Sequence, residues 1–74
     1  MTPALFSFDT THMALWAEEV ARDRGIPAEV VPAPEEIEAK CGLALETLPD
    51  RAEDLRLALE EEGVVFYPPG DPPS

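Results

Sequence analysis

Cys41 and His12 carry the side chains best suited to chemistry, and each is the only residue of its type among the 74. A thiol is a nucleophile only as the thiolate, and at an ordinary pKa of about 8.5 only a few per cent is ionised at neutral pH. A single cysteine cannot form an intramolecular disulfide. One thiol and one imidazole also leave a tetrahedral zinc site about two ligands short. We therefore expect neither a metal nor a cofactor in this chain.

Charged residues close to Cys41 in the sequence act in opposite directions. Glu35, Glu36 and Glu38 precede it, and carboxylates near sulfur disfavour the thiolate. Lys40 is the one neighbouring cation. A lone cysteine is also commonly a small buried hydrophobe. The sequence leaves open which side chains face the thiol, so a reactive cysteine and a structural one are both compatible with it.

Apolar runs and turn residues predict six helices and strands. Asp9, Thr10 and Thr11 are residue types that cap helix N-termini, and glycine commonly ends a helix in the left-handed conformation, as we expect at Gly25 and Gly63. The expected strands cover 4–8, 26–31, 43–45 with an extension to 48, and 64–67, and the expected helices cover 12–24 and 50–62.

The order of these elements predicts an α+β fold. A β-α-β-β-α-β succession is the ferredoxin-like pattern, in which two helices cover one face of a four-stranded antiparallel sheet with strand order 4-1-3-2. Asp50 and Glu53 have the spacing of a capping box at the start of the second helix. We expect one domain over residues 1–67, followed by a flexible, proline-rich tail over 68–74.

This topology brings the candidate residues to one edge of the sheet. The first strand ends where the third begins, so Thr10, Thr11 and His12 should lie near Cys41 and Gly42. A helix N-terminus carries unpaired N–H groups and about half a positive charge, which lowers the pKa of a nearby thiol. His12 could act there as a cation or a proton acceptor. Gly42 would allow a close approach by backbone or by a partner.

Composition excludes several classes of protein. Five basic and 16 acidic residues give a net charge of −11. Nucleic-acid binding depends on Lys and Arg, and anionic membranes attract the same residues, so we expect neither partner. The start of the chain has no basic residues or long apolar run, and no segment approaches the roughly 20 apolar residues of a membrane span. We therefore expect a cytoplasmic protein.

Two segments resemble those of one protein family. FDTTHMALWAE over residues 8–18 resembles an opening of the form F-x-S-T-x-x-A-L-x-x-E. Residues 25–45 resemble the pattern G-I-x-x-x-x-x-P-x-P-x-x-I-x-x-x-C-G-L-A-L. Together they resemble the selenium/sulfur carrier protein-like family over roughly residues 4–67.

The resemblance implies a cysteine that carries sulfur or selenium as a persulfide-type group. It points to Cys41 as the carrying nucleophile, and to Thr10, Thr11 and Gly42 as motif positions around it. The chain has Glu35 where the family usually has a basic residue.

Three functions are compatible with the sequence. The favoured one is a sulfur or selenium relay, in which Cys41 takes the atom from a donor protein and passes it to an acceptor protein. The alternative is a non-catalytic domain that binds a protein or ligand and keeps a structural cysteine. A third is a redox sensor whose Cys41 forms an intermolecular disulfide. No motif of a hydrolase or a nucleotide-dependent enzyme is present, which favours a carrier or accessory protein over an independent enzyme and leaves enzymatic activity open.

Overall fold

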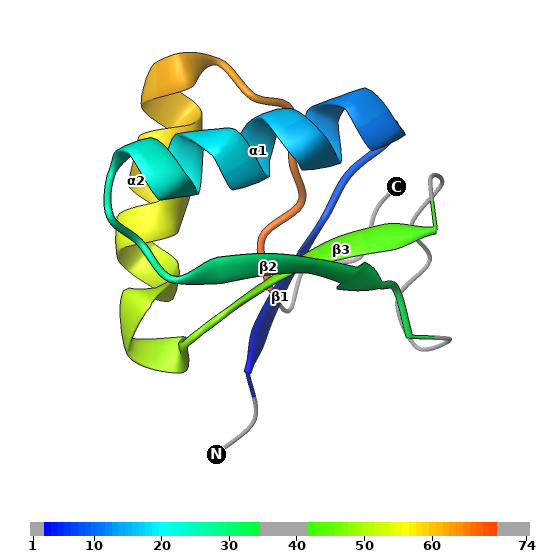
Figure 1. Cartoon of the computed structure of the whole chain (residues 1–74), viewed down its shortest axis with the longest axis horizontal. Helices are drawn as coiled ribbons and strands as arrows, with labels where there is room; N and C mark the ends of the chain where they lie inside the picture. Colours follow the sequence, from blue (N-terminus) through cyan, green and yellow to red (C-terminus); the bar gives the residue numbers. More distant parts are fainter. Residues whose placement is uncertain (1–2, 35–41, 70–74) are drawn as a thin grey trace.

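The structure, a computed structural model, describes residues 3–34 and 42–69 (Figure 1). The elements in chain order are strand β1 (Ala4–Ser7), helix α1 (Thr11–Asp23), strands β2 (Ala28–Pro32) and β3 (Leu43–Thr47), a short 3-10 helix η1 (Pro49–Arg51) and helix α2 (Ala52–Glu62). The α+β class is therefore confirmed.

The three strands form one antiparallel sheet in the order β1-β3-β2. Leu45 of β3 pairs with Phe6 on one side and with Val30 on the other, so these three residues form a row across the sheet. Side chains two residues apart share a face of a strand. The register therefore directs this apolar row to the face that the helices cover.

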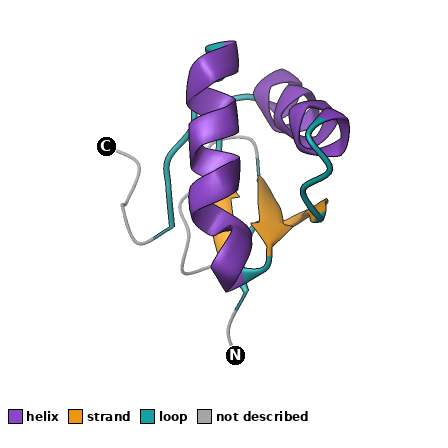
Figure 2. Cartoon of the chain, turned by 90° about the vertical axis from the view of Figure 1, so that its left-hand side faces the viewer, coloured by secondary structure: helices purple, strands orange, loops and turns teal. Residues whose placement is uncertain are grey.

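The core lies between that face and the two helices. Phe6, Leu45, Leu55 and Leu59 are completely buried. From α1 the core receives four small or branched side chains, namely Ala14, Ala17, Val20 and Ala21. Their small size lets α1 pack closely, and α1 and α2 lie against each other in both views (Figures 1 and 2). Full burial of one Leu or Phe side chain is worth about 1.5–3 kcal/mol, so these few residues dominate the stability of the sheet–helix contact.

Both helices end in the same way. Gly25 and Gly63 have φ angles of 70° and 82°, which glycine adopts without the steric cost of a side chain. After each glycine comes a buried apolar residue, Ile26 or Val64, whose N–H donates to a carbonyl five residues earlier at 2.8 or 3.0 Å. A left-handed glycine followed by this backward hydrogen bond is the Schellman motif. Its presence at Gly25 and Gly63 confirms the helix ends expected there.

The start of α2 differs from the expected capping box. Leu48 and Arg51 precede η1 and α2, and neither supplies a side-chain cap. A 3-10 turn opens the segment instead, with the Arg51 N–H donating to the Leu48 carbonyl at 2.9 Å. Glu53 pairs with Arg56 on the surface of the helix. The Asp50–Glu53 interpretation was therefore wrong, because Asp50 lies inside η1 and the Glu53 carboxylate is bonded to Arg56.

The fourth strand expected over 64–67 is not formed, so the four-stranded ferredoxin-like sheet is not confirmed. Among the described residues the sheet has three strands, and this segment adds an isolated bridge between Tyr67 and Ser7. The Val64 N–H is already used at the end of α2. Pro68 and Pro69 follow Tyr67 and have no N–H to donate. In the register set by the Tyr67–Ser7 pair, the next residue that would donate to β1 is Pro69, so the pairing ends at a single bridge.

None of the described helices has the length and apolarity needed to cross a membrane, and α1 is the longest with 13 residues.

Candidate functional site

The sheet register brings the start of α1 and the start of β3 to one edge. Ser7, the last residue of β1, pairs with Ala44, the second residue of β3. The chain after Ser7 and the chain before Ala44 therefore leave the sheet at the same edge (Figure 1). Thr10 follows on the first segment and Gly42 lies on the second. Cys41, the expected nucleophile, lies outside the described residues.

Thr10 is the N-cap of α1. It has an extended backbone, and its Oγ1 accepts a hydrogen bond from the Met13 N–H at 3.1 Å. Of the three cap-type residues in the sequence, only this one is used as the side-chain cap. The role of Thr10 at this edge is therefore to begin the helix at a fixed position.

Thr11 and His12 form the first turn of α1, and both are exposed. The first turn contains no acidic residue. The partial positive charge of the helix end is therefore not neutralised from within that turn. Such an end favours an anionic group, for example a thiolate, close to it.

Gly42 immediately precedes β3 and has a φ angle of 73°. Its carbonyl accepts a hydrogen bond from the Ala33 N–H at 2.9 Å, which extends the β2–β3 pairing beyond the strand ends. A β-carbon added here would meet no atom within 4 Å. The glycine is required by its backbone conformation, and no atom of residues 3–34 or 42–69 fills the space beside it.

Asp9 and Tyr67 form a hydrogen-bonded pair at the same edge. The sequence predicted no role at a site for either residue. The Tyr67 hydroxyl donates to the Asp9 carboxylate, with distances of 2.9 and 3.1 Å to its two oxygens. The backbone of Tyr67 also exchanges two hydrogen bonds with Ser7. The hydrogen bond to Asp9, followed by desolvation, raises the pKa of Tyr67 above its ordinary value. The expected pairing of residues 64–67 with the first strand was the sequence signal that could have placed Tyr67 here.

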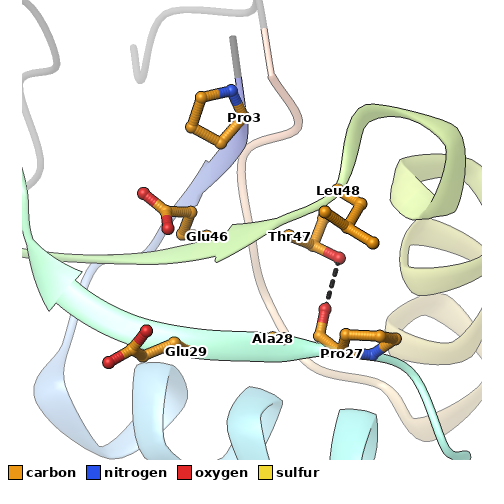
Figure 3. A pocket seen from close by; sticks show the side chains of 7 residues that line it. All are labelled: Pro3, Pro27, Ala28, Glu29, Glu46, Thr47 and Leu48. Carbon is orange, nitrogen blue, oxygen red and sulfur yellow. Dashed lines mark hydrogen bonds between the residues drawn. The ribbon is translucent and has the colours of Figure 1, made fainter. Parts of the chain in front are cut away.

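Other polar groups do not extend this site. Within residues 3–34 and 42–69, no group of three or more His, Cys, Asp or Glu residues could hold a metal ion. A depression of about 400 Å³ lies at the opposite end of β3 (Figure 3). There the Thr47 hydroxyl donates to the Pro27 carbonyl at 2.6 Å, and Glu29 pairs across the sheet with Glu46.

Comparison with known protein families gives a match over most of the chain. A family described as "Putative Se/S carrier protein-like" matches residues 4–67, which is most of the chain. The chain belongs to this family. The resemblance inferred from the sequence is thereby confirmed at the level of the family. No curated protein and no solved structure matches the chain.

Proposed function

We propose that this protein carries sulfur or selenium between proteins as a persulfide-type group on Cys41. Membership of the carrier family by a chain with a single thiol carries the proposal. The residue next to Cys41 in the sequence is Gly42, which is exposed and meets no other described residue where a side chain would stand. Both features suit a cysteine that must meet two large partners in turn.

The transfer consists of two exchanges at the outer atom. The Cys41 thiolate attacks the outer sulfur of a donor persulfide, R–S–S–H; a new S–S bond forms, the donor S–S bond breaks, and the donor leaves as its thiolate. Cys41 then holds –S–S–H. An acceptor thiolate attacks that outer sulfur and releases the Cys41 thiolate. With an outer selenium atom the bonds change in the same way, and neither exchange needs an external oxidant or reductant.

The start of α1 supports this chemistry electrostatically. Thr10 fixes where the helix begins, and the first turn that follows has no carboxylate. The N–H groups and partial positive charge of the helix start favour the Cys41 thiolate both when it attacks the donor and when the acceptor displaces it. His12, exposed in the same turn, is available as a cation or a proton acceptor.

Three further proposals concern the fold, the partners and the extent of the domain. The fold is a reduced ferredoxin-like fold, since β1-β3-β2 is the order of its first three strands and the Ser7–Tyr67 bridge lies where its fourth strand would pair. The donor and acceptor are proteins in the cytoplasm, and the domain covers residues 1–67.

The decisive test is sulfur transfer to the intact protein. A cysteine desulfurase carrying labelled sulfur is mixed with the wild type and with Cys41→Ser, and intact mass and label are followed before and after addition of thiol reductant. We expect one added sulfur on the wild type, removable by reductant, and none on Cys41→Ser. Equal labelling of Cys41→Ser would overturn the proposal.

Alkylation of Cys41 across the pH range separates the carrier from the alternative. An inflection well below the ordinary thiol pKa of about 8.5 is expected for a carrier. Protection of the thiol until the protein unfolds would instead favour a binding or regulatory domain with a structural cysteine.

A further inference from the structure

One face of α1 forms a shallow groove that the site chemistry does not use. His12, Leu15, Trp16 and Glu19 line a depression of about 470 Å³, and these residues recur at helical spacing along one side of the helix. A smaller depression of about 130 Å³ continues from Trp16 and Glu19 toward the end of α2, where it meets Asp23 and Glu62. We call these six residues the α1 groove.

The floor of the α1 groove is apolar. Leu15 is 52% exposed, although its helix neighbours Ala14 and Ala17 are completely buried. Trp16 packs partly against the core and leaves the rest of its side chain at the surface. A single exposed leucine is ordinary. Leu15 and Trp16 together in one depression, however, form a surface on which one apolar side chain of a partner can be buried.

The rim of the α1 groove is acidic. Glu19 and Asp23 make no ion pair with any residue in the described part of the chain. Arg24, the cation at the far end, is already paired with Glu61 and Glu62 at 3.5 and 3.1 Å. The groove therefore presents uncompensated negative charge beside an apolar floor.

We propose that the α1 groove docks a basic segment of a partner protein, with one aliphatic or aromatic side chain on Leu15 and Trp16 and Lys or Arg beside Glu19 and Asp23. A second copy of this chain fits poorly, because each copy carries a net charge of −11. An anionic membrane is repelled for the same reason.

The position of the groove suggests which partner this is. His12 belongs both to the groove and to the first turn of α1, at the sheet edge from which Gly42 leaves. A protein lying along α1 therefore reaches the candidate site. This assignment of the partner as a sulfur or selenium donor or acceptor rests on the proposed function, whereas the basic character of the segment does not.

The test uses Trp16, the only tryptophan, as its reporter. The full chain is titrated with a synthetic amphipathic peptide of about twelve residues that has Leu at helical spacing and Lys between. A peptide with Glu in place of Lys is the control. We expect a saturable change in Trp16 emission with the basic peptide and none with the acidic one.

Two matched double variants locate the binding surface. Glu19→Gln with Asp23→Asn removes two charges from the groove, and Glu29→Gln with Glu46→Gln removes two from the depression of Figure 3. The first should weaken binding about fivefold or more, and the second by much less. Leu15→Ser, which removes part of the apolar floor, should also weaken it. Equal losses in both double variants, or equal binding of the two peptides, would overturn the proposal.

Failure of the groove and failure of the carrier function are distinguishable. Cys41→Ser should bind the peptide as the wild type does. If the desulfurase labels the wild type and the Glu19→Gln/Asp23→Asn variant with the same KM, the donor does not use the groove although the carrier function stands. If peptide binding is as expected and no sulfur is transferred, the groove stands and the carrier function fails.

Discussion

At the scale of single residues, Tyr67 connects the end of the described chain to the start of α1. Its hydroxyl donates to the Asp9 carboxylate, and its backbone exchanges hydrogen bonds with Ser7, 60 positions earlier in the chain. Asp9 immediately precedes the helix cap Thr10. Tyr67 therefore restrains the segment from which the candidate site is built.

Removal of the Tyr67 hydroxyl should lower stability in a pH-dependent way. The pKa of Tyr67 is raised in the folded protein above its ordinary value near 10. Its hydrogen bond therefore stabilises the fold fully below about pH 10 and is lost as pH rises through the higher, folded pKa. Tyr67→Phe should melt at a lower temperature than the wild type near pH 8, and the two should converge at alkaline pH. A constant difference in melting temperature across this range would contradict the assignment.

Removal of the Thr10 cap should destabilise α1. Thr10→Ala leaves the Met13 N–H without its acceptor, which costs about 1 kcal/mol in the free energy of unfolding. Thr10→Ser keeps an acceptor and should lose little. Thr11→Ala is the matched control, since Thr11 is exposed and is not the cap. Urea unfolding of the three variants measures this, and equal effects at positions 10 and 11 would show that the cap contributes nothing.

At the scale of elements, β2 is an edge strand whose outward backbone N–H groups are partly occupied or missing. The Val30 N–H donates to the Glu18 carboxylate of α1 at 3.4 Å, and Pro32 at the end of the strand has no N–H. Unpaired edge donors are templates for pairing with another chain. The Glu18 contact occupies one of them, and Pro27 immediately before β2 has no N–H to present.

Replacement of Glu18 by Ala should expose this edge. Hydrogen exchange at the Val30 amide should become faster, and self-association at high concentration should increase relative to the wild type. Glu18→Gln is the control because its amide oxygen can still accept the bond. Exchange measured by NMR and mass measured by light scattering test the prediction. An unchanged Val30 amide in Glu18→Ala would mean that the 3.4 Å contact gives no protection.

At the scale of the whole molecule, charge repulsion opposes folding. The net charge is −11, and the longest dimension is 28 Å. The Debye length is about 30 Å at 0.01 M salt and about 10 Å at 0.1 M. All carboxylates therefore interact with one another at the lower salt concentration. The four arginines are already paired with acidic residues on the surface, and such pairs contribute little.

Added salt should therefore stabilise the protein. Raising NaCl from about 0.01 M to about 0.1 M screens the repulsion among carboxylates more than it weakens a few exposed ion pairs. The melting temperature followed by circular dichroism should rise. A fall in the melting temperature would mean that the arginine pairs outweigh the excess negative charge.

The sequence by itself determined what depends on neighbours along the chain. The helix ends at Gly25 and Gly63 were predictable because a left-handed glycine acts on the turn immediately before it. Apolar periodicity predicted both helices and three strands, since burial on one face imposes the spacing. Thr10, Thr11 and His12 were correctly assigned to the start of the first helix. The role of Cys41 stays a prediction, because it lies outside the described residues.

The tertiary structure decided what depends on competition between distant groups. Val64 donates its N–H to the end of α2, Tyr67 pairs with Ser7, and Pro68 and Pro69 that follow have no N–H, so the expected fourth strand became one bridge. Asp is preferred over Thr as an N-cap, yet Thr10 is the cap, while Asp9 accepts a hydrogen bond from Tyr67, 58 residues away. The expected pairing of residues 64–67 with the first strand brings Tyr67 to this edge, but the sequence does not show that its hydroxyl bonds Asp9. The hydrogen bond between Tyr67 and Asp9 forms because the bridge between Tyr67 and Ser7 brings the Tyr67 side chain close to the residues that follow Ser7.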